Sequence, residues 1–150
     1  MSQSLSRIYV HVVFSTKHRV AVLSDAVRPH LYAYTATVLS NLDCVPIEIG
    51  GVADHIHILS TISNNLSVSK FIEEVKKPTS KWLKTQDASL RDFYWQSGYG
   101  AFSVSQSNVN RVREYIIKQE EHHRTMTYQD ELRKLLEAHG VEFDERYLWD

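Results

Sequence analysis

The spacing of apolar residues changes along this chain in a definite order, and that order restricts the fold more than any other feature. Residues 8–15, IYVHVVFS, are a short β-branched and aromatic run that predicts a strand. Apolar residues then recur at three- and four-residue steps from Val27 to Leu42, which predicts an amphipathic helix beginning near Ser24 or Asp25. Strand and helix spacing therefore follow one another from the start of the chain.

The next segment predicts a pair of adjacent strands. Residues 45–49 and 53–62 have strand composition, and the Gly50-Gly51 pair lies between them. Because glycine accepts positive φ, we expect this pair to form the tight turn that joins the two strands.

A second helix is predicted from Leu66, where helical spacing returns. Pro78 removes a backbone donor and is expected to kink or end that helix, leaving residues 79–84 as a second short helical piece. Strand-like segments follow at 93–95 and 101–105, on either side of a glycine-containing turn.

Two more helices are predicted in the last third, one from Asn108 to about His123 and one from Thr127 to Gly140. The first six elements then give the ferredoxin-like βαββαβ order, an α+β fold with an antiparallel sheet and helices on one face, to which C-terminal helices are added. We expect one domain over residues 1–150, with three parts: a core over 1–106, a tyrosine-bearing helix over 107–124, and a C-terminal helix and tail over 125–150.

Composition narrows the functional classes. Cys44 is the only cysteine, which excludes an intrachain disulfide and a zinc ribbon, so any metal must be held by histidine, carboxylate, amide or phenol groups. The net charge of −1 gives no general argument for nucleic acid. The sequence has no long apolar run, no signal-peptide pattern and no phosphate-binding Gly-x-x-x-x-Gly-Lys motif. We therefore expect a cytoplasmic protein with no membrane span and no nucleotide cofactor.

Two histidines within GGVADHIHIL form the first candidate site. His55 and His57 are two residues apart on a predicted strand, so they share one face, roughly 7 Å apart, and could converge on one cation. Ile56 and Ile58 then point to the opposite face. Two packed and hydrogen-bonded imidazoles explain the spacing equally well. Asp54 could orient an imidazole, although a role in the turn is the simpler explanation.

A second candidate lies on the predicted helix near residue 115. Tyr115 and Gln119 are four residues apart and therefore share a helix face. This pair is a common coincidence, and it gains weight only if it meets the two histidines. His122 and His123 could also bind a metal, but a solvated helix end whose dipole they complement is the simpler interpretation.

Basic and aromatic residues suggest where DNA could bind. Candidates for phosphate contacts lie after the first strand and along the second helix: Lys17, His18, Arg19, Lys70, Lys76, Lys77, Lys81 and Lys84. A solvated helix face explains such lysines as well. Trp95, Tyr99 and Phe102 could stack on unpaired bases, but aromatic residues in strand-like segments belong more often to the core.

Five segments in order resemble one enzyme family: VHVVFSTKHR at 10–19, GGVADHIHIL at 50–59, FIEEVKKPTSKWL at 71–83, WQSGYGAFSVS at 95–105 and REYIIKQEEHH at 113–123. Together they resemble the single-tyrosine HUH transposases, which include the IS200-like insertion-sequence enzymes and the REP-associated tyrosine transposases. His55-Ile56-His57 is similar to the His-hydrophobic-His motif of that family.

The resemblance implies a single-strand DNA endonuclease and strand transferase that acts on hairpin ends of a mobile element through a 5′-phosphotyrosine. It implies that His55, His57 and Gln119 bind Mg²⁺ or Mn²⁺, that Tyr115 is the nucleophile, and that the enzyme is a homodimer. Such a neutral ligand set leaves the full charge of the ion to polarise a phosphodiester. Two alternatives remain open at this point: a phosphodiesterase that activates water, and a non-catalytic ferredoxin-like module that binds nucleic acid.

Overall fold

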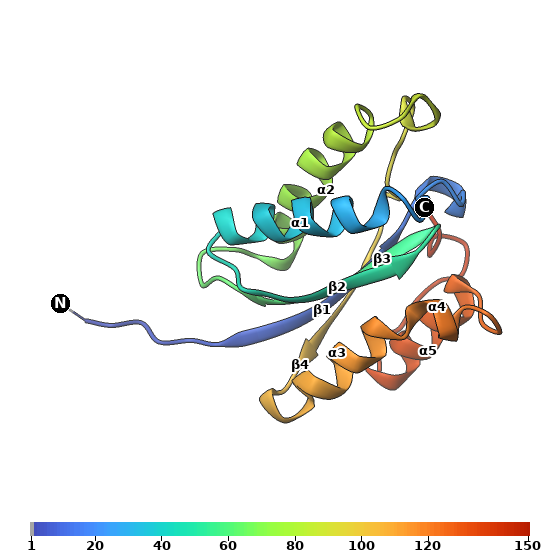
Figure 1. The fold of residues 1–150 in the computed structure, drawn as a ribbon. Helices are drawn as coiled ribbons and strands as arrows, with labels where there is room; N and C mark the ends of the chain where they lie inside the picture. Colours follow the sequence, from blue (N-terminus) through green and yellow to red (C-terminus); the bar gives the residue numbers. More distant parts are fainter. Residues whose placement is uncertain (1) are drawn as a thin grey trace.

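A computed structural model describes residues 2–150, and its centre is a four-stranded antiparallel sheet (Figure 1). The strands are β1 (Ile8–Ser15), β2 (Pro46–Val52), β3 (His55–Ile62) and β4 (Gly100–Val104), arranged in the order β2-β3-β1-β4. This order, together with the helices between the strands, confirms the α+β, ferredoxin-like βαββαβ arrangement.

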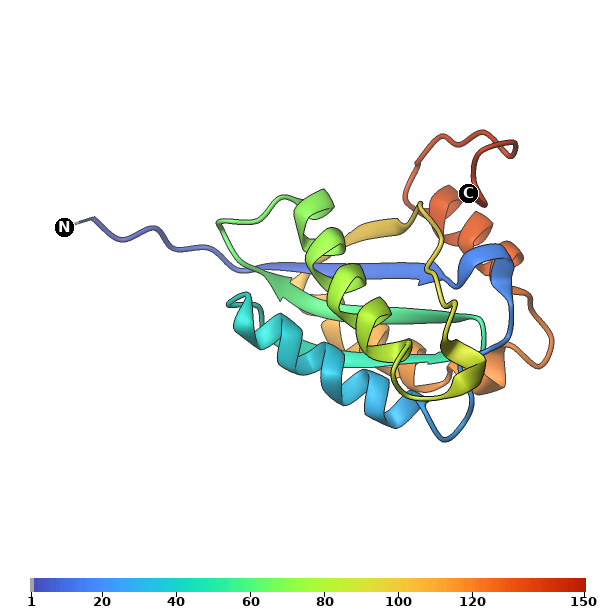
Figure 2. The ribbon, with the colours of Figure 1, turned by 90° about the horizontal axis from the view of Figure 1, so that it is seen from above.

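Helices cover both faces of this sheet. Helices α1 (Arg28–Asn41) and α2 (Val68–Leu83) lie on one face, as Figure 2 shows from that side. Helices α3 (Val109–Ile117), α4 (Gln119–His122) and α5 (Tyr128–Ala138) lie on the other face (Figure 1). Among residues 2–150, none of these helices is long and apolar enough to cross a membrane.

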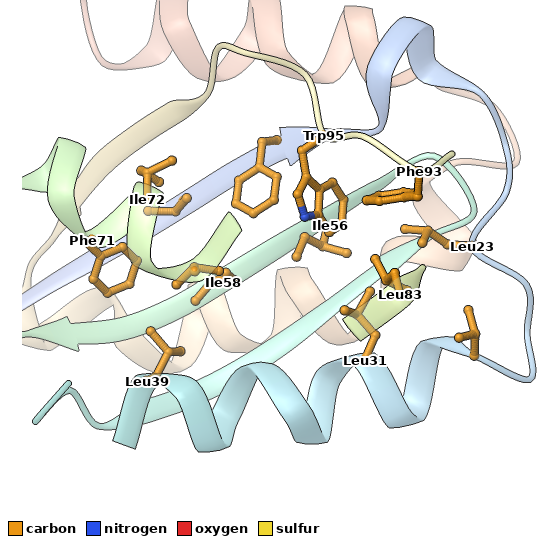
Figure 3. Packing of buried hydrophobic residues seen from close by; sticks show 14 of the residues in the cluster. Leu23, Leu31, Leu39, Ile56, Ile58, Phe71, Ile72, Leu83, Phe93 and Trp95 are labelled. Atoms are coloured by element: carbon orange, nitrogen blue, oxygen red, sulfur yellow. The ribbon is translucent and has the colours of Figure 1, made fainter. Parts of the chain in front are cut away.

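The main core lies between the sheet and the α1–α2 layer. Ile56 and Ile58 of β3 are fully buried there against side chains such as Leu31 and Phe71 (Figure 3). Full burial of each such side chain stabilises the fold by about 1.5–3 kcal/mol. The alternation in HIHI therefore places the isoleucines in the core and the two histidines on the opposite face, beneath the C-terminal helices.

The predicted end of the second helix at Pro78 is wrong, because α2 continues through the proline to Leu83. Proline cannot donate a backbone hydrogen bond. The neighbouring Thr79 hydroxyl donates to the carbonyl of Val75 at 2.7 Å and to that of Lys76 at 3.2 Å. Burial of Phe71, Val75, Thr79 and Leu83 along one side of the helix outweighs the lost hydrogen bond.

The prediction that the two glycines form the turn is also wrong. Gly50 and Gly51 belong to β2, neither has positive φ, and the turn consists of Ala53 and Asp54. A Cβ on Gly50 would lie 2.9 Å from Ile116 Cγ2, so this glycine lets α3 pack directly on the strand.

Two further segments differ from the sequence prediction. The helix expected over 108–123 is divided at Lys118 into α3 and α4, which lets Gln119 turn into the interior. Residues 93–95 form no strand, and only Trp95 makes an isolated bridge, to Thr16. The last helix begins as predicted, since the Thr127 hydroxyl accepts the Asp130 N–H at 3.1 Å.

Candidate metal centre

Three histidines on the sheet face opposite the main core come together because of strand register. His55 and His57 of β3 pair with Ser15 and Val13 of β1, and His11 lies farther along the same face of β1. All three imidazoles are buried. The α5 helix covers them, and the close approach of α5 depends on Gly100, where a Cβ would lie 2.9 Å from Leu132 Cδ1.

A carboxylate from α5 lies at the point where the imidazoles converge. Glu131 Oε1 is 3.2 Å from His55 Nε2, 2.9 Å from His57 Nε2 and 3.1 Å from His123 Nε2. Ligand atoms of these four residues all lie within 4.8 Å of one another. Glu131 is 1% exposed, so its charge is balanced by the imidazoles rather than by water.

The three imidazoles beside Glu131 are those of His55, His57 and His123, and each is oriented by a contact of its Nδ1. Nδ1 of His55 lies 2.6 Å from Asp54 Oδ1, and Nδ1 of His123 lies 2.6 Å from the carbonyl of Met126. Nδ1 of His57 lies 2.8 Å from Nε2 of the buried His11. These partners turn all three Nε2 atoms toward Glu131, which is how metal-binding histidines are usually held.

Tyr115 and Gln119 reach the same carboxylate within one chain. Gln119 Oε1 lies 3.1 Å from His55 Nε2, and Gln119 donates from Nε2 to Glu131 Oε2 at 3.0 Å. The Tyr115 hydroxyl donates to Glu131 Oε2 as well. The structure therefore brings together the predicted residues Asp54, His55, His57, Tyr115 and Gln119, even though α3 and α4 are separate helices.

The charges of the site follow from burial and from these contacts. Burial alone would raise the pKa of Glu131, but the nearby imidazoles of His123, His55 and His57 hold it well below its usual range. Burial opposes the charged form of His55, yet Asp54 and Glu131 raise its pKa to about 9. Burial lowers the pKa of His57. Burial and the Glu131 charge raise the pKa of Tyr115, so its phenol is protonated at neutral pH.

The donor set fits a divalent metal ion. His123 Nε2 is buried and, among residues 2–150, has no hydrogen-bond partner, although Glu131 Oε1 is nearby. Because the carbonyl of Met126 engages the other nitrogen, the Nε2 lone pair of the neutral ring points to the centre and is free to bind a cation. Imidazoles together with a carboxylate suit first-row transition ions such as Mn²⁺.

The centre is accessible from one side. An open cavity of about 670 Å³ reaches Asp54, His123 and Tyr128, and its wall includes Arg28 and Arg124. Arg28 pairs with Asp25 and Glu120, which line the same cavity, so Arg124 is left as the cation that a phosphodiester entering it could contact.

Sequence reasoning missed Glu131 and His11, and it set His123 aside as a helix end. One signal for Glu131 was present. It follows Tyr128 by three residues and precedes Leu135 by four, so it belongs to the apolar stripe of its helix. A carboxylate on that stripe must find buried partners, and the three histidines supply them.

Several of the basic residues predicted to contact DNA pair or pack with side chains outside this centre. On α2, Lys70 pairs with Glu73 and Glu74, and Lys77 also pairs with Glu73. Lys17 lies over the Tyr94 ring and Arg19 over the Trp149 ring. Their contacts to DNA, and those of Lys81, stay predictions.

Lys76 has a structural environment that the other lysines lack. Its ammonium donates to the carbonyls of Gln96, Ser97 and Gly98 at 2.7, 3.3 and 2.8 Å. Burial lowers its pKa to about 8, so the ammonium form still predominates at neutral pH. We expect Lys76→Met to lower the free energy of unfolding by about 1–3 kcal/mol, since three carbonyls lose their donor.

Urea denaturation of Lys76→Met and of the exposed control Lys81→Met measures this effect. Unchanged stability of Lys76→Met together with weakened binding of single-stranded DNA would instead assign Lys76 to phosphate contact.

Comparisons with known proteins give one family match and two similar folds. The family model described as "Transposase IS200 like" matches residues 4–119. A "putative transposase" from Deinococcus radiodurans R1 has a TM-score of 0.61 at 17% identity, over 79% of this chain and 98% of that one. A REP-associated tyrosine transposase bound to a REP hairpin has a TM-score of 0.59 at 14% identity, over 82% of this chain and 74% of that one. No curated protein matches this chain.

Proposed function

The chain belongs to the IS200-like transposase family, and from that premise we propose that it is a metal-dependent enzyme that nicks and rejoins single-stranded DNA. The observation that carries the proposal is the meeting of Tyr115, Gln119, His55 and His57 around one buried carboxylate, that of Glu131. The substrate is proposed to be a hairpin end of a mobile element, in line with the REP hairpin bound by the structural relative.

His55, His57 and Gln119 are the proposed ligands of Mg²⁺ or Mn²⁺, and the structure adds His123 and Glu131 as candidates. When bound, the ion supplies Lewis-acid polarisation of a phosphodiester oxygen. Asp54 and His11 hold the imidazoles of His55 and His57 from behind. With Glu131 as a ligand, the set favours Mn²⁺ over Mg²⁺, because imidazole is a poor donor for Mg²⁺.

Tyr115 is the proposed nucleophile. Its oxygen attacks the DNA phosphorus, a Tyr–O–P bond forms, and the bond from phosphorus to the 3′-oxygen breaks, which leaves a 5′-phosphotyrosine and a free 3′-hydroxyl. The phenol is protonated at neutral pH, and its hydrogen bond to Glu131 Oε2 orients its oxygen. The phenol proton leaves to solvent as the Tyr–O–P bond forms, and the departing 3′-oxygen takes a proton from solvent. Attack by another 3′-hydroxyl reverses the step and joins strands without ATP.

Tyr115 is proposed to act within the site of its own subunit. Its ring centroid is 5.8 Å from that of His57 in the same chain. A homodimer remains part of the proposal, because two nicks call for two tyrosines, but each subunit then uses its own nucleophile.

A mixing experiment tests this arrangement. We expect that combining His57→Ala protein with Tyr115→Phe protein restores no cleavage, since neither subunit type has both halves of the site. Each variant alone is the control. A mixed sample that recovers about a quarter of wild-type cleavage would show that the tyrosine acts on the partner's metal, because random mixing gives half heterodimers with one intact site each.

The function itself is tested with a fluorescent single-stranded hairpin oligonucleotide, Mn²⁺ or Mg²⁺, and a denaturing protein gel. The expected result is a protein-linked 3′ fragment, attached through its 5′-phosphate, that disappears with EDTA and does not form on fully paired duplex. Metal-dependent cleavage without any protein-linked product would favour the water-activating phosphodiesterase. Binding without cleavage under either metal would favour the non-catalytic module.

A further inference from the structure

Tyr94 is exposed within a segment whose other aromatic residues are buried. Its side chain is 57% exposed, whereas the neighbouring Phe93 and Trp95 are 5% and 8% exposed. The ammonium of Lys17 lies 5.5 Å from the Tyr94 ring centroid, and the ammonium of Lys84 lies 4.6 Å from it. Two cations on one exposed ring repel each other, and an anion placed beside the ring would relieve that repulsion.

The backbone that carries this ring is held in place by its neighbours. The carbonyl of Tyr94 accepts the Lys17 N–H at 2.8 Å. Next to it, the Trp95 ring packs edge-on against Phe14 with a centroid separation of 4.8 Å, and its N–H donates to Thr79 at 3.0 Å. A platform whose backbone is fixed in this way loses little conformational entropy when a ligand binds.

The loop that carries Lys17 also has a fixed conformation, and this conformation includes strained backbone. His18 and Arg19 follow it with φ of 59° and 58°, a left-handed conformation that residues other than glycine adopt at a cost of about 1 kcal/mol each. The loop is held by the Thr16 hydroxyl, which donates to the Val20 carbonyl at 2.7 Å. Strained backbone of this kind persists where the surrounding structure fixes a functional position.

The platform lies at the same end of the sheet as the candidate metal centre. Ser15 pairs with His55, and the Thr16 N–H donates to the carbonyl of Asp54 at 2.8 Å, so Lys17 follows directly from the edge of the centre. On the α2 side, Lys84 donates to Ser80 at 2.8 Å. Open cavities of about 240 and 430 Å³ lie nearby, the first lined by Lys17 and Tyr94 and the second by Lys84 and Trp95.

We propose that Tyr94, Lys17 and Lys84 form a binding site for one unpaired nucleotide of the DNA strand, next to the cleavage site. The base stacks on the tyrosine ring, and the two ammonium groups bind the phosphates on either side of it. This inference rests on the proposed function only in taking single-stranded DNA as the substrate. Stacking on an aromatic ring tolerates any base, so the site positions the strand without reading its sequence.

Binding measured in EDTA tests the site without any need for cleavage. Fluorescence anisotropy follows the full chain with a hairpin oligonucleotide that carries unpaired flanks. We expect Tyr94→Leu to weaken binding roughly 5- to 150-fold and Tyr94→Phe to retain near wild-type affinity, because the phenylalanine ring still stacks. We expect Lys84→Gln to lower the slope of log affinity against log salt by about 0.7.

Abasic substitution identifies the nucleotide. One flanking position, when made abasic, should weaken wild-type binding and leave no further effect of Tyr94→Leu. The exposed Tyr147→Leu is the matched control and should bind as wild type does.

Two results would overturn the site. Wild-type affinity in Tyr94→Leu, while the wild-type protein still binds and cleaves the oligonucleotide, would remove the platform and leave the proposed function standing. No binding of single-stranded DNA by the wild-type protein would end both proposals.

Discussion

Replacing Tyr115 with phenylalanine is expected to abolish the protein–DNA adduct and strand joining, with a loss of at least about 10³-fold in rate. The substitution removes only the hydroxyl, which is the proposed nucleophile and the group that donates to Glu131. The ring keeps its packing against His122, 4.8 Å away between centroids. Because Tyr115 is only partly buried, losing one hydrogen bond should lower the free energy of unfolding by about 1 kcal/mol.

The measurement is a single-turnover reaction with an end-labelled hairpin oligonucleotide, resolved on denaturing protein and DNA gels. Tyr147→Phe is the control, since Tyr147 is 66% exposed and outside the candidate site. Cleavage that continues in Tyr115→Phe without an adduct would remove Tyr115 as nucleophile and support hydrolysis by activated water. A normal melting curve for the variant keeps that interpretation distinct from loss of the fold.

The parts of the site that the sequence predicts are those that local geometry determines. Two residues apart on a strand must share a face, so HIHI alone places His55 and His57 opposite Ile56 and Ile58. The sequence alone did not connect Tyr115 and Gln119 with the histidines, and only the family resemblance did so. That resemblance is confirmed by the family match over residues 4–119.

The parts that the sequence does not predict depend on contacts between distant segments. Glu131 meets His57 across 74 residues of chain, and only the packing of α5 on β1 and β4 brings them together. Local rules failed elsewhere for the same reason. Pro78 predicts a helix end, but burial of one side of α2 keeps the helix continuous. The two glycines predict a turn, but Gly50 lies in a strand, where the absence of a side chain lets Ile116 pack closely.

Removal of the Glu131 carboxylate is expected to have the largest effect on metal binding. We expect Glu131→Gln to weaken Mn²⁺ binding by at least about 10- to 100-fold, because the variant loses the one anionic donor of the set. Gln119→Ala should weaken binding less, since it removes a neutral oxygen and leaves the carboxylate. Isothermal titration calorimetry on both variants and on wild type measures the difference, with circular dichroism as the control for folding.

The pH dependence of stability and of Mn²⁺ affinity in the wild-type protein is a second test of the role of Glu131. In the metal-free chain, Asp54 and Glu131 raise the pKa of His55 to about 9, against a strong opposing effect of burial. The raised pKa stabilises the fold fully below about pH 6.5, and that contribution is lost as pH rises through 9. Binding of Mn²⁺ needs the neutral imidazole, so its affinity should increase with pH over the same interval.

In Glu131→Gln the pH dependence of Mn²⁺ affinity should become shallower, because His55 loses one of the two anions that hold its proton. Gln119→Ala keeps both anions and should retain the wild-type slope. The two variants therefore separate a ligand that carries charge from a ligand that does not. Wild-type Mn²⁺ affinity in Glu131→Gln would place the carboxylate outside the ligand set, and Gln119 would then be the third ligand beside His55 and His57.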